Sequence, residues 1–103
     1  MLIVLCTCPD LKTAEKIATE LVEKRLAACV NIIKIEKSIY RWKGKTRAER
    51  EYLLIIKTTK TRYPRLETRI KSMHPYDVPE IIGLKIEKGN NRYIEWVKRS
   101  CLA

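Results

Sequence analysis

The side chains best suited to chemistry in this 103-residue chain gather in one short segment, residues 74–80, which reads HPYDVPE. The segment holds the only histidine, His74, together with two of the four prolines and two carboxylates. Proline fixes its own φ and biases the preceding residue toward an extended backbone, so the segment is predicted to be stiff and non-helical. The imidazole of His74, a thiolate from Cys6 or Cys8 and the carboxylate of Glu80 would together suit copper or zinc.

Each of these residues also has a simpler structural interpretation. Cysteine often packs as a small buried hydrophobe, and Met73 is expected in the core. A lone histidine beside a proline can be explained by hydrogen bonds within its own loop. His74 with Asp77 or Glu80 could carry protons, because histidine titrates near neutral pH. No nucleophile motif or phosphate-binding loop stands beside it, so no enzyme is predicted, and Asp77 can be a turn residue.

Length and composition predict one domain that covers residues 1–103. The hydrophobic fraction is 46%, which is typical of a globular chain. The 22 Lys+Arg against 12 Asp+Glu give a net charge of +10, which attracts polyanions and also suits a heat-adapted protein. The four cysteines form no C-x-x-C pair, which argues against structural zinc. Without a basic leader or an apolar run of about 18 residues, the chain is predicted to be soluble and cytoplasmic, with reduced thiols.

The first half of the chain is predicted to form a strand, a helix and a long hairpin. Residues 2–8 are almost continuously apolar, as in a strand buried on both faces. Residues 13–25 follow the helical period, with Asp10 or Thr13 as the cap. The apolar positions of this helix are Ala14, Ile17, Ala18, Leu21 and Val22.

The hairpin is predicted from two strands at residues 28–42 and 51–59, joined by a turn at Lys43-Gly44-Lys45. In the second half of the first strand, successive side chains are expected to point to opposite faces. Ile35 and Ile39 are therefore expected on one face, together with Lys37 and Arg41. Arms of this length reach roughly 30–45 Å, which is long for a small domain. A projecting edge of this kind needs a cover, and self-association would supply it.

The second half is predicted to form a helix, a strand and a final helix. Pro64 suits the first turn of a helix whose inner stripe is Leu66, Ile70 and Met73. Residues 81–86 form the last strand, and residues 92–101 form a helix after the Gly89-Asn90-Asn91 turn. The side chains that this helix is expected to bury are Tyr93, Ile94 and Val97.

This order of elements is the α+β, ferredoxin-like β-α-β-β-α-β pattern with one additional C-terminal helix. Right-handed crossovers give the spatial strand order 4-1-3-2, with the last strand antiparallel to the first. The end of the first strand, with Cys6 and Cys8, would then lie beside the segment 74–80.

The hairpin tip is strongly basic and carries aromatic residues. Its charges are Arg41, Lys43, Lys45, Arg47 and Arg50 against Glu49, with Tyr40 and Trp42 interleaved. Single-stranded nucleic acid uses such a combination. The sheet lacks the aromatic consensus of an RNA-recognition module, so we favour a solvated hairpin whose Trp42 packs on a neighbouring subunit.

Several blocks of the sequence, in register, resemble the CutA family. They are RLAACVNI at 25–32, SIYRWKG at 38–44, Glu51 ahead of IKT at 56–58, HPYDVPEI at 74–81 and YIEW at 93–96. The resemblance implies a homotrimer packed through the long hairpins, in the manner of the PII signalling proteins. It also implies an association with divalent cation tolerance, copper above all.

The resemblance places metal contacts on Cys6 and His74, with Glu80 as a nearby carboxylate. Some family members carry a His-His pair where this chain has Met73-His74, so a two-histidine copper site is not expected. The prediction is therefore weak binding of Cu(II) or another divalent cation at the rim between the first and last strands, without an organic cofactor.

Clefts between subunits form a second predicted site. Trp42, Glu51, Tyr76 and Asp77 would line them. In the alternative function, a PII-like regulatory module binds a small ligand there, or a protein partner, and has no metal role. Nucleic acid binding through the basic hairpin is the less favoured third possibility.

Overall fold

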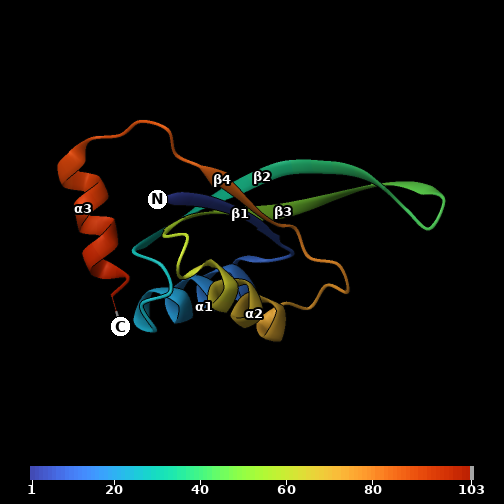
Figure 1. Cartoon of the computed structure of the whole chain (residues 1–103). Coiled ribbons are helices and arrows are strands. Elements are labelled where there is room, and N and C mark those ends of the chain that lie inside the picture. Colours follow the sequence, from blue (N-terminus) through green and yellow to red (C-terminus); the bar gives the residue numbers. More distant parts are fainter. Residues whose placement is uncertain (103) are drawn as a thin grey trace.

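A computed structural model describes residues 1–102, which form a four-stranded sheet with helices on one face and at one end (Figure 1). The order of elements is the predicted one. The elements are β1 (Leu2–Cys8), α1 (Leu11–Glu23), β2 (Cys29–Trp42), β3 (Lys45–Thr58), α2 (Tyr63–Met73), β4 (Ile81–Lys85) and α3 (Asn91–Ser100). None of these helices is long and apolar enough to cross a membrane.

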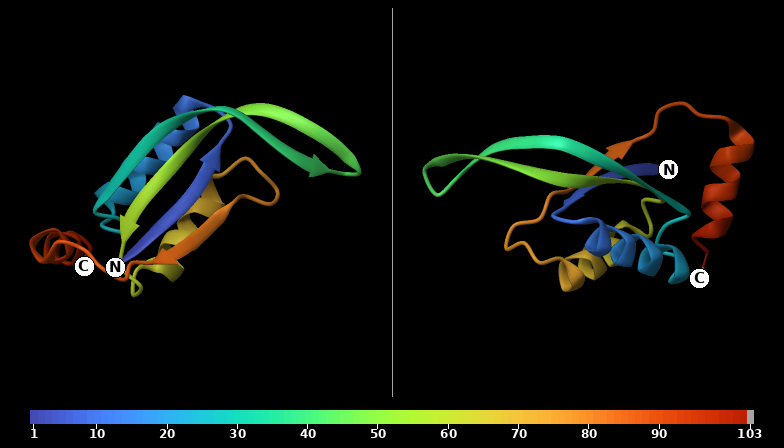
Figure 2. Two further views of the ribbon diagram at one scale, coloured as in Figure 1. Left: turned by 90° about the horizontal axis from the view of Figure 1, so that it is seen from above. Right: turned by 180° about the vertical axis from the view of Figure 1, so that it is seen from behind.

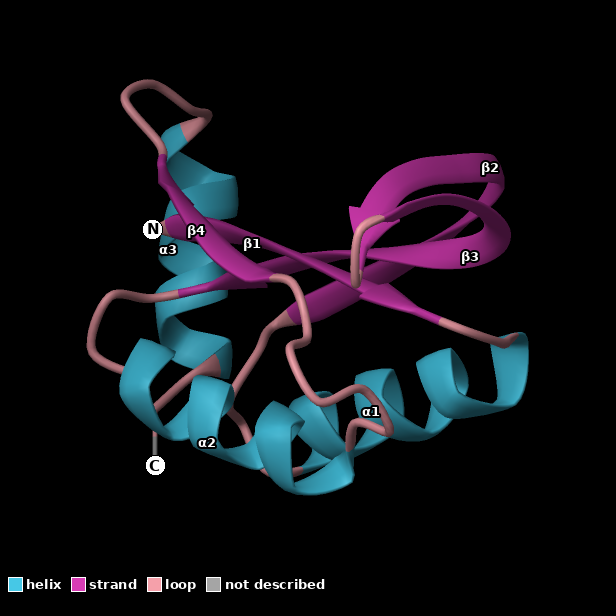
Figure 3. Ribbon diagram, turned by 90° about the vertical axis from the view of Figure 1, so that its right-hand side faces the viewer, coloured by secondary structure: helices cyan, strands magenta, loops and turns pink. Residues whose placement is uncertain are grey.

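The sheet has the order β2-β3-β1-β4, and all three neighbouring pairs are antiparallel. This is the predicted 4-1-3-2 arrangement read from the other edge, so the ferredoxin-like α+β fold is confirmed. Helices α1 and α2 lie side by side under one face of the sheet, whereas α3 stands at the end of the sheet (Figure 3).

The core lies between the sheet and helices α1 and α2. Side chains of β1 alternate across the sheet, so every second residue points toward the helices. The large core side chains with no exposed surface are Val4, Ile17, Leu21, Leu54, Ile56, Leu66 and Ile70. Thr58 is equally buried and donates its hydroxyl to the Leu26 carbonyl at 2.7 Å, so this buried polar side chain is paired.

Helix α1 begins at Leu11, two residues earlier than predicted. Asp10 is its N-cap, with φ −150°, and its side chain accepts a hydrogen bond from the Thr13 amide at 2.7 Å. The predicted stripe is buried except for Val22, which is 42% exposed. Val22 lies one position beyond Leu21, about 100° around the helix, and so lies at the edge of the buried stripe.

The hairpin formed by β2 and β3 is longer than the sequence predicted. Each strand has 14 residues, and β3 begins at Lys45, not at Glu51. The first six residues of β3 are exposed and carry no apolar alternation, so only their pairing with β2 identifies them as a strand. The turn is therefore Lys43-Gly44 alone, and both residues have positive φ (52° and 76°), as two-residue hairpin turns require.

A β-bulge interrupts β2 between Ile35 and Ser38. Ile35 pairs with Glu51 and Ser38 pairs with Glu49, so one extra residue of β2 fits between them. Paired residues share a face of the sheet, and Ile39 pairs with Ala48. The prediction that Ile35 and Ile39 share a face is therefore wrong, because the extra residue reverses the alternation.

The last two helices and β4 differ only slightly from their predicted limits. Helix α2 begins at Tyr63, one residue before Pro64. Helix α3 begins at Asn91, after Asn90, whose side chain accepts from the Tyr93 amide at 3.2 Å. Only Val97 of α3 is fully buried, and Tyr93 is 41% exposed. The predicted burial of Tyr93 is wrong, because α3 packs on the end of the sheet through a single row of side chains.

The second face of the sheet has no helix over it. Eight apolar side chains from all four strands occupy this open face, as the pairing register shows: Ile3, Leu5, Ile33, Ile35, Leu53, Ile55, Ile82 and Leu84. Ile33, Ile82 and Leu84 are 47–49% exposed. Helices α1 and α2 lie behind the sheet in the left view of Figure 2, so neither of them covers this face.

Candidate metal centre

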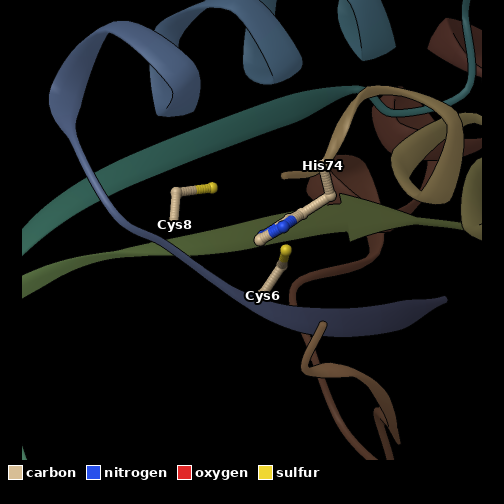
Figure 4. A group of neighbouring side chains, drawn as sticks. All are labelled: Cys6, Cys8 and His74. Carbon is tan, nitrogen blue, oxygen red and sulfur yellow. The ribbon is translucent and has the colours of Figure 1, made fainter. Parts of the chain in front are cut away.

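Three potential metal ligands meet where β1 ends and β4 begins. The sulfur atoms of Cys6 and Cys8 and a ring nitrogen of His74 all lie within 4.8 Å of one another (Figure 4). Both cysteines have no exposed surface, and His74 is 8% exposed. Cys6 pairs with Ile81 of β4, so the predicted proximity of the first strand and segment 74–80 is confirmed.

The backbone explains why these side chains converge. Cys6 and Cys8 are two residues apart on β1, so both point from the same face of the sheet toward the helices. His74 caps the C-terminus of α2, and its amide donates to the Ile70 carbonyl at 2.9 Å. Its backbone is extended (φ −81°, ψ 134°), as expected for a residue that precedes proline. The end of α2 thereby directs the imidazole to the thiols.

Both ring nitrogens of His74 have hydrogen-bond partners. The Tyr76 amide donates to Nδ1 at 3.1 Å, so Nδ1 carries no proton. Nε2 therefore carries the proton and donates to the Thr7 carbonyl at 2.7 Å. The expected bond within the loop of His74 is confirmed for Nδ1, whereas Nε2 bonds to Thr7 of the distant strand β1. A metal ion bound at Nδ1 would have to displace the Tyr76 amide, while the Nε2 bond to Thr7 would orient the ring.

The two thiols differ in acidity. Their mutual hydrogen bond, burial and the charges of Cys8, Glu80 and Glu51 raise the pKa of Cys6. The same hydrogen bond lowers the pKa of Cys8, although burial opposes this. Cys8 is therefore the thiol that loses a proton first, and Cys6 keeps its proton. Metal ions bind thiolates, so a cation that uses both sulfurs must release the Cys6 proton.

Glu80 stands apart from this group. Its side chain is exposed, and it is not among the three ligand residues that lie within 4.8 Å. Its charge nevertheless contributes to the raised pKa of Cys6. The structure thus brings His74 together with both candidate thiols, Cys6 and Cys8, where one of them was expected from the sequence, while Glu80 lies at the periphery. The sequence feature that pointed to Cys8 was its position two residues after Cys6 on the same predicted strand, which places both side chains on one face.

The residues predicted for the clefts are only partly brought together within one chain. The Tyr76 hydroxyl donates to Glu51 Oε2 at 2.7 Å, and Glu51 is 7% exposed. Burial and the Glu51 carboxylate raise the pKa of Tyr76. Asp77 is exposed beside Tyr76. Trp42 pairs with Lys45 at the tip of the hairpin, far along the strands from Glu51.

Comparisons with known proteins agree with this architecture. The profile of the family described as CutA1 divalent ion tolerance protein matches residues 2–100. The divalent-cation tolerance protein CutA of Thermus thermophilus is 48% identical over 98 residues, which is 95% of either chain. Human protein CutA is 50% identical over 93 residues, which is 90% of this chain and 52% of the human protein. The chain thus spans about half the length of that relative.

A solved structure extends the similarity to three dimensions. The periplasmic divalent cation tolerance protein CutA from Archaeoglobus fulgidus superposes with a TM-score of 0.95 at 38% identity, over 99% of this chain and 100% of that chain. The names of these relatives describe tolerance proteins and no enzyme. The chain therefore belongs to the CutA1 divalent ion tolerance protein family.

Proposed function

We propose that this protein binds a divalent cation, Cu(II) or a similar metal, through Cys6, Cys8 and His74, and that this binding serves divalent cation tolerance. The observation that carries the proposal is the convergence of the three buried ligand atoms within 4.8 Å. Three ligands of one ion at bond lengths of about 2.0–2.3 Å lie roughly 3.3–4.0 Å apart, so a contraction of about 1 Å would bring the three atoms onto one ion. Two thiols and an imidazole suit borderline-soft cations such as copper and zinc. No catalytic role is part of the proposal.

Two features make this site a weak binder. A metal must displace a hydrogen-bond partner of His74, either the Tyr76 amide from Nδ1 or the Thr7 carbonyl from Nε2, and it must also displace the proton from Cys6. Glu80 contributes negative charge at the periphery and is no direct ligand in this arrangement. Because metal and proton compete for Cys6, whose pKa is raised, affinity should increase as the pH rises.

Cobalt(II) titration tests the site without the thiol oxidation that Cu(II) causes. We expect thiolate-to-metal absorption in the native protein and an affinity at least about tenfold lower in Cys6→Ser, Cys8→Ser and His74→Ala. The native affinity should rise between pH 6 and pH 8.5. Cys101→Ser is the matched control, since Cys101 is also buried, at 3% exposure, but lies in a different cluster. Equal affinity in all four variants would mean that the metal sits on other surface groups.

The proposal includes a homotrimer in the cytoplasm. The apolar open face and the long hairpin support assembly, because an apolar face of this extent on a soluble chain calls for a partner. The compartment stays a prediction, since the relative from Archaeoglobus fulgidus is named as periplasmic.

A second candidate function is the PII-like binding of a small ligand or a protein partner in clefts between subunits. The observation that favours it is the buried Glu51–Tyr76 hydrogen bond at the base of the hairpin. Trp42 would join this pair only from a neighbouring subunit, and Asp77 would lie at the rim.

Thermal-shift screening of nucleotides and carboxylates distinguishes the two functions. A cleft ligand present at 100 times its dissociation constant adds about 2.7 kcal/mol to the free energy of unfolding. Tyr76→Phe should reduce that shift, because it removes the hydroxyl that orients Glu51. A screen in which metal-free protein responds to no compound would contradict the cleft function.

A further inference from the structure

A groove between α1 and α2 lies outside every site described so far. It encloses about 1020 Å³, and its lining includes none of Cys6, Cys8, His74, Glu51 and Tyr76. Five cationic side chains and two carboxylates, Glu20 and Glu23, line it. The cations are Lys24, Arg25, Arg62, Arg65 and Arg69. Figure 1 shows the two helices that form this groove side by side.

Contacts within the groove leave most of the positive charge free. Arg69 is neutralised by Glu20, whose Oε2 accepts from Nη2 at 2.7 Å and from Nε at 2.8 Å. Arg62 donates its Nε to the Cys101 carbonyl at 2.6 Å, which fixes the guanidinium, and no carboxylate within residues 1–102 forms a salt bridge with it. Glu23 is then the only carboxylate in the lining to oppose four cations.

Arg25 occupies a backbone position that normally favours glycine. Its φ is 58°, and the Leu26 amide donates to the Leu21 carbonyl at 2.9 Å, as at a helix end closed by a left-handed residue. An arginine there costs backbone energy that glycine would avoid. Despite this cost, the position holds arginine instead of glycine, so a guanidinium group stands at the end of the groove formed by α1.

We propose that this groove binds a polyphosphate, either free or carried by a nucleotide. Guanidinium groups bind phosphate oxygens through pairs of charge-assisted hydrogen bonds, and Arg62 is already oriented for this. The lining contains no aromatic side chain, so it offers no platform on which nucleic acid bases could stack. The groove therefore recognises phosphates in series, a role separate from the metal centre.

Calorimetric titration of the metal-free protein with inorganic tripolyphosphate tests the proposal. The double variant Arg25→Gly/Arg65→Gln should bind at least about tenfold more weakly, because two charge-assisted hydrogen bonds are lost. The matched control is Lys43→Gly/Lys45→Gln at the hairpin tip. Lys43 also has positive φ, 52°, so both variants lower the net charge by two and place one glycine in a left-handed position. The control should bind within about threefold of the native protein, since distant charges are screened.

Three outcomes would overturn the proposal. One is no heat of binding with tripolyphosphate at 50 mM salt. Another is an equal loss in both double variants, which would reflect net charge alone. The third is displacement of tripolyphosphate by a single-stranded oligonucleotide at a lower concentration than by ATP, which would identify nucleic acid as the ligand. Thermal unfolding of each variant confirms that it is folded, and ATP and tripolyphosphate should bind within about threefold of each other if phosphates alone are recognised.

Discussion

Replacing Ile33 with aspartate should dissociate the assembled protein into single chains. Ile33 lies on the open face, is 47% exposed and pairs with Leu53. In a trimer built on this face, the new carboxylate would be buried without a partner, at a cost of several kcal/mol. Light scattering at low micromolar concentration should give three times the 12.1 kDa chain mass for the native protein and a single chain mass for Ile33→Asp.

Val22→Asp provides the control for this experiment. Val22 is 42% exposed, so it matches Ile33 in chemistry and exposure, but it lies on α1 at the other side of the sheet. This variant should keep the native mass. The trimer would be ruled out if the native protein scattered as one chain, and the open face would be the wrong interface if Val22→Asp alone dissociated it.

His74→Ala should lower the free energy of unfolding by about 2–5 kcal/mol, even in metal-free protein. The substitution leaves the Thr7 carbonyl and the Tyr76 amide without their partners, and each unpaired buried group costs roughly 1–3 kcal/mol. Denaturant unfolding in the presence of a chelator, at one fixed chain concentration, measures the loss. The chelator separates this structural role from metal binding.

Two further substitutions divide the effect between the two hydrogen bonds. His74→Asn places an amide oxygen near the position of Nδ1, and this oxygen can still accept a hydrogen bond from the Tyr76 amide. Glutamine places an amide nitrogen near Nε2 and can still donate to Thr7. Each should recover part of the loss. If the free energy of unfolding of His74→Ala were within about 0.5 kcal/mol of the native value, this would contradict the bridging role of the residue.

Patterns that act along one element were readable from the sequence. The period of residues 13–25 identified α1, because it depends on neighbours within one or two turns, whereas Asp10 and Thr13 both remained candidates for its cap. The strand order followed from chain connectivity and handedness, and it brought Cys6 toward His74 across about 70 residues of sequence.

Features that depend on a second strand or a precise distance were not readable. Residues 45–50 became strand only because β2 pairs with them, and no glycine or proline marks the bulge after Ile35. The partners of His74 needed atomic distances, because a free ring nitrogen and one bonded to the Tyr76 amide look the same in sequence. Glu51 was expected in a cleft, but its near-complete burial within one chain depends on Tyr76 reaching it from the distant segment.

The bulge in β2 divides the hairpin arm into two halves that differ in how freely their side chains can be substituted. Before Ile35, each side chain lies either in the packed interior or on the open face. Neighbours in the same chain therefore limit the substitutions possible there. From Ser38 onward, even-numbered residues of β2 lie on the face that odd-numbered residues occupy up to Ile35. Nearly all side chains in this outer half are exposed. Removing Lys37 would restore one continuous alternation along β2 and leave Ile39 paired with Ala48, because β3 has no extra residue at this point. The single extra residue thus affects the local bend and twist of the arm, while the pairing with β3 fixes which side chains each face of its far end presents.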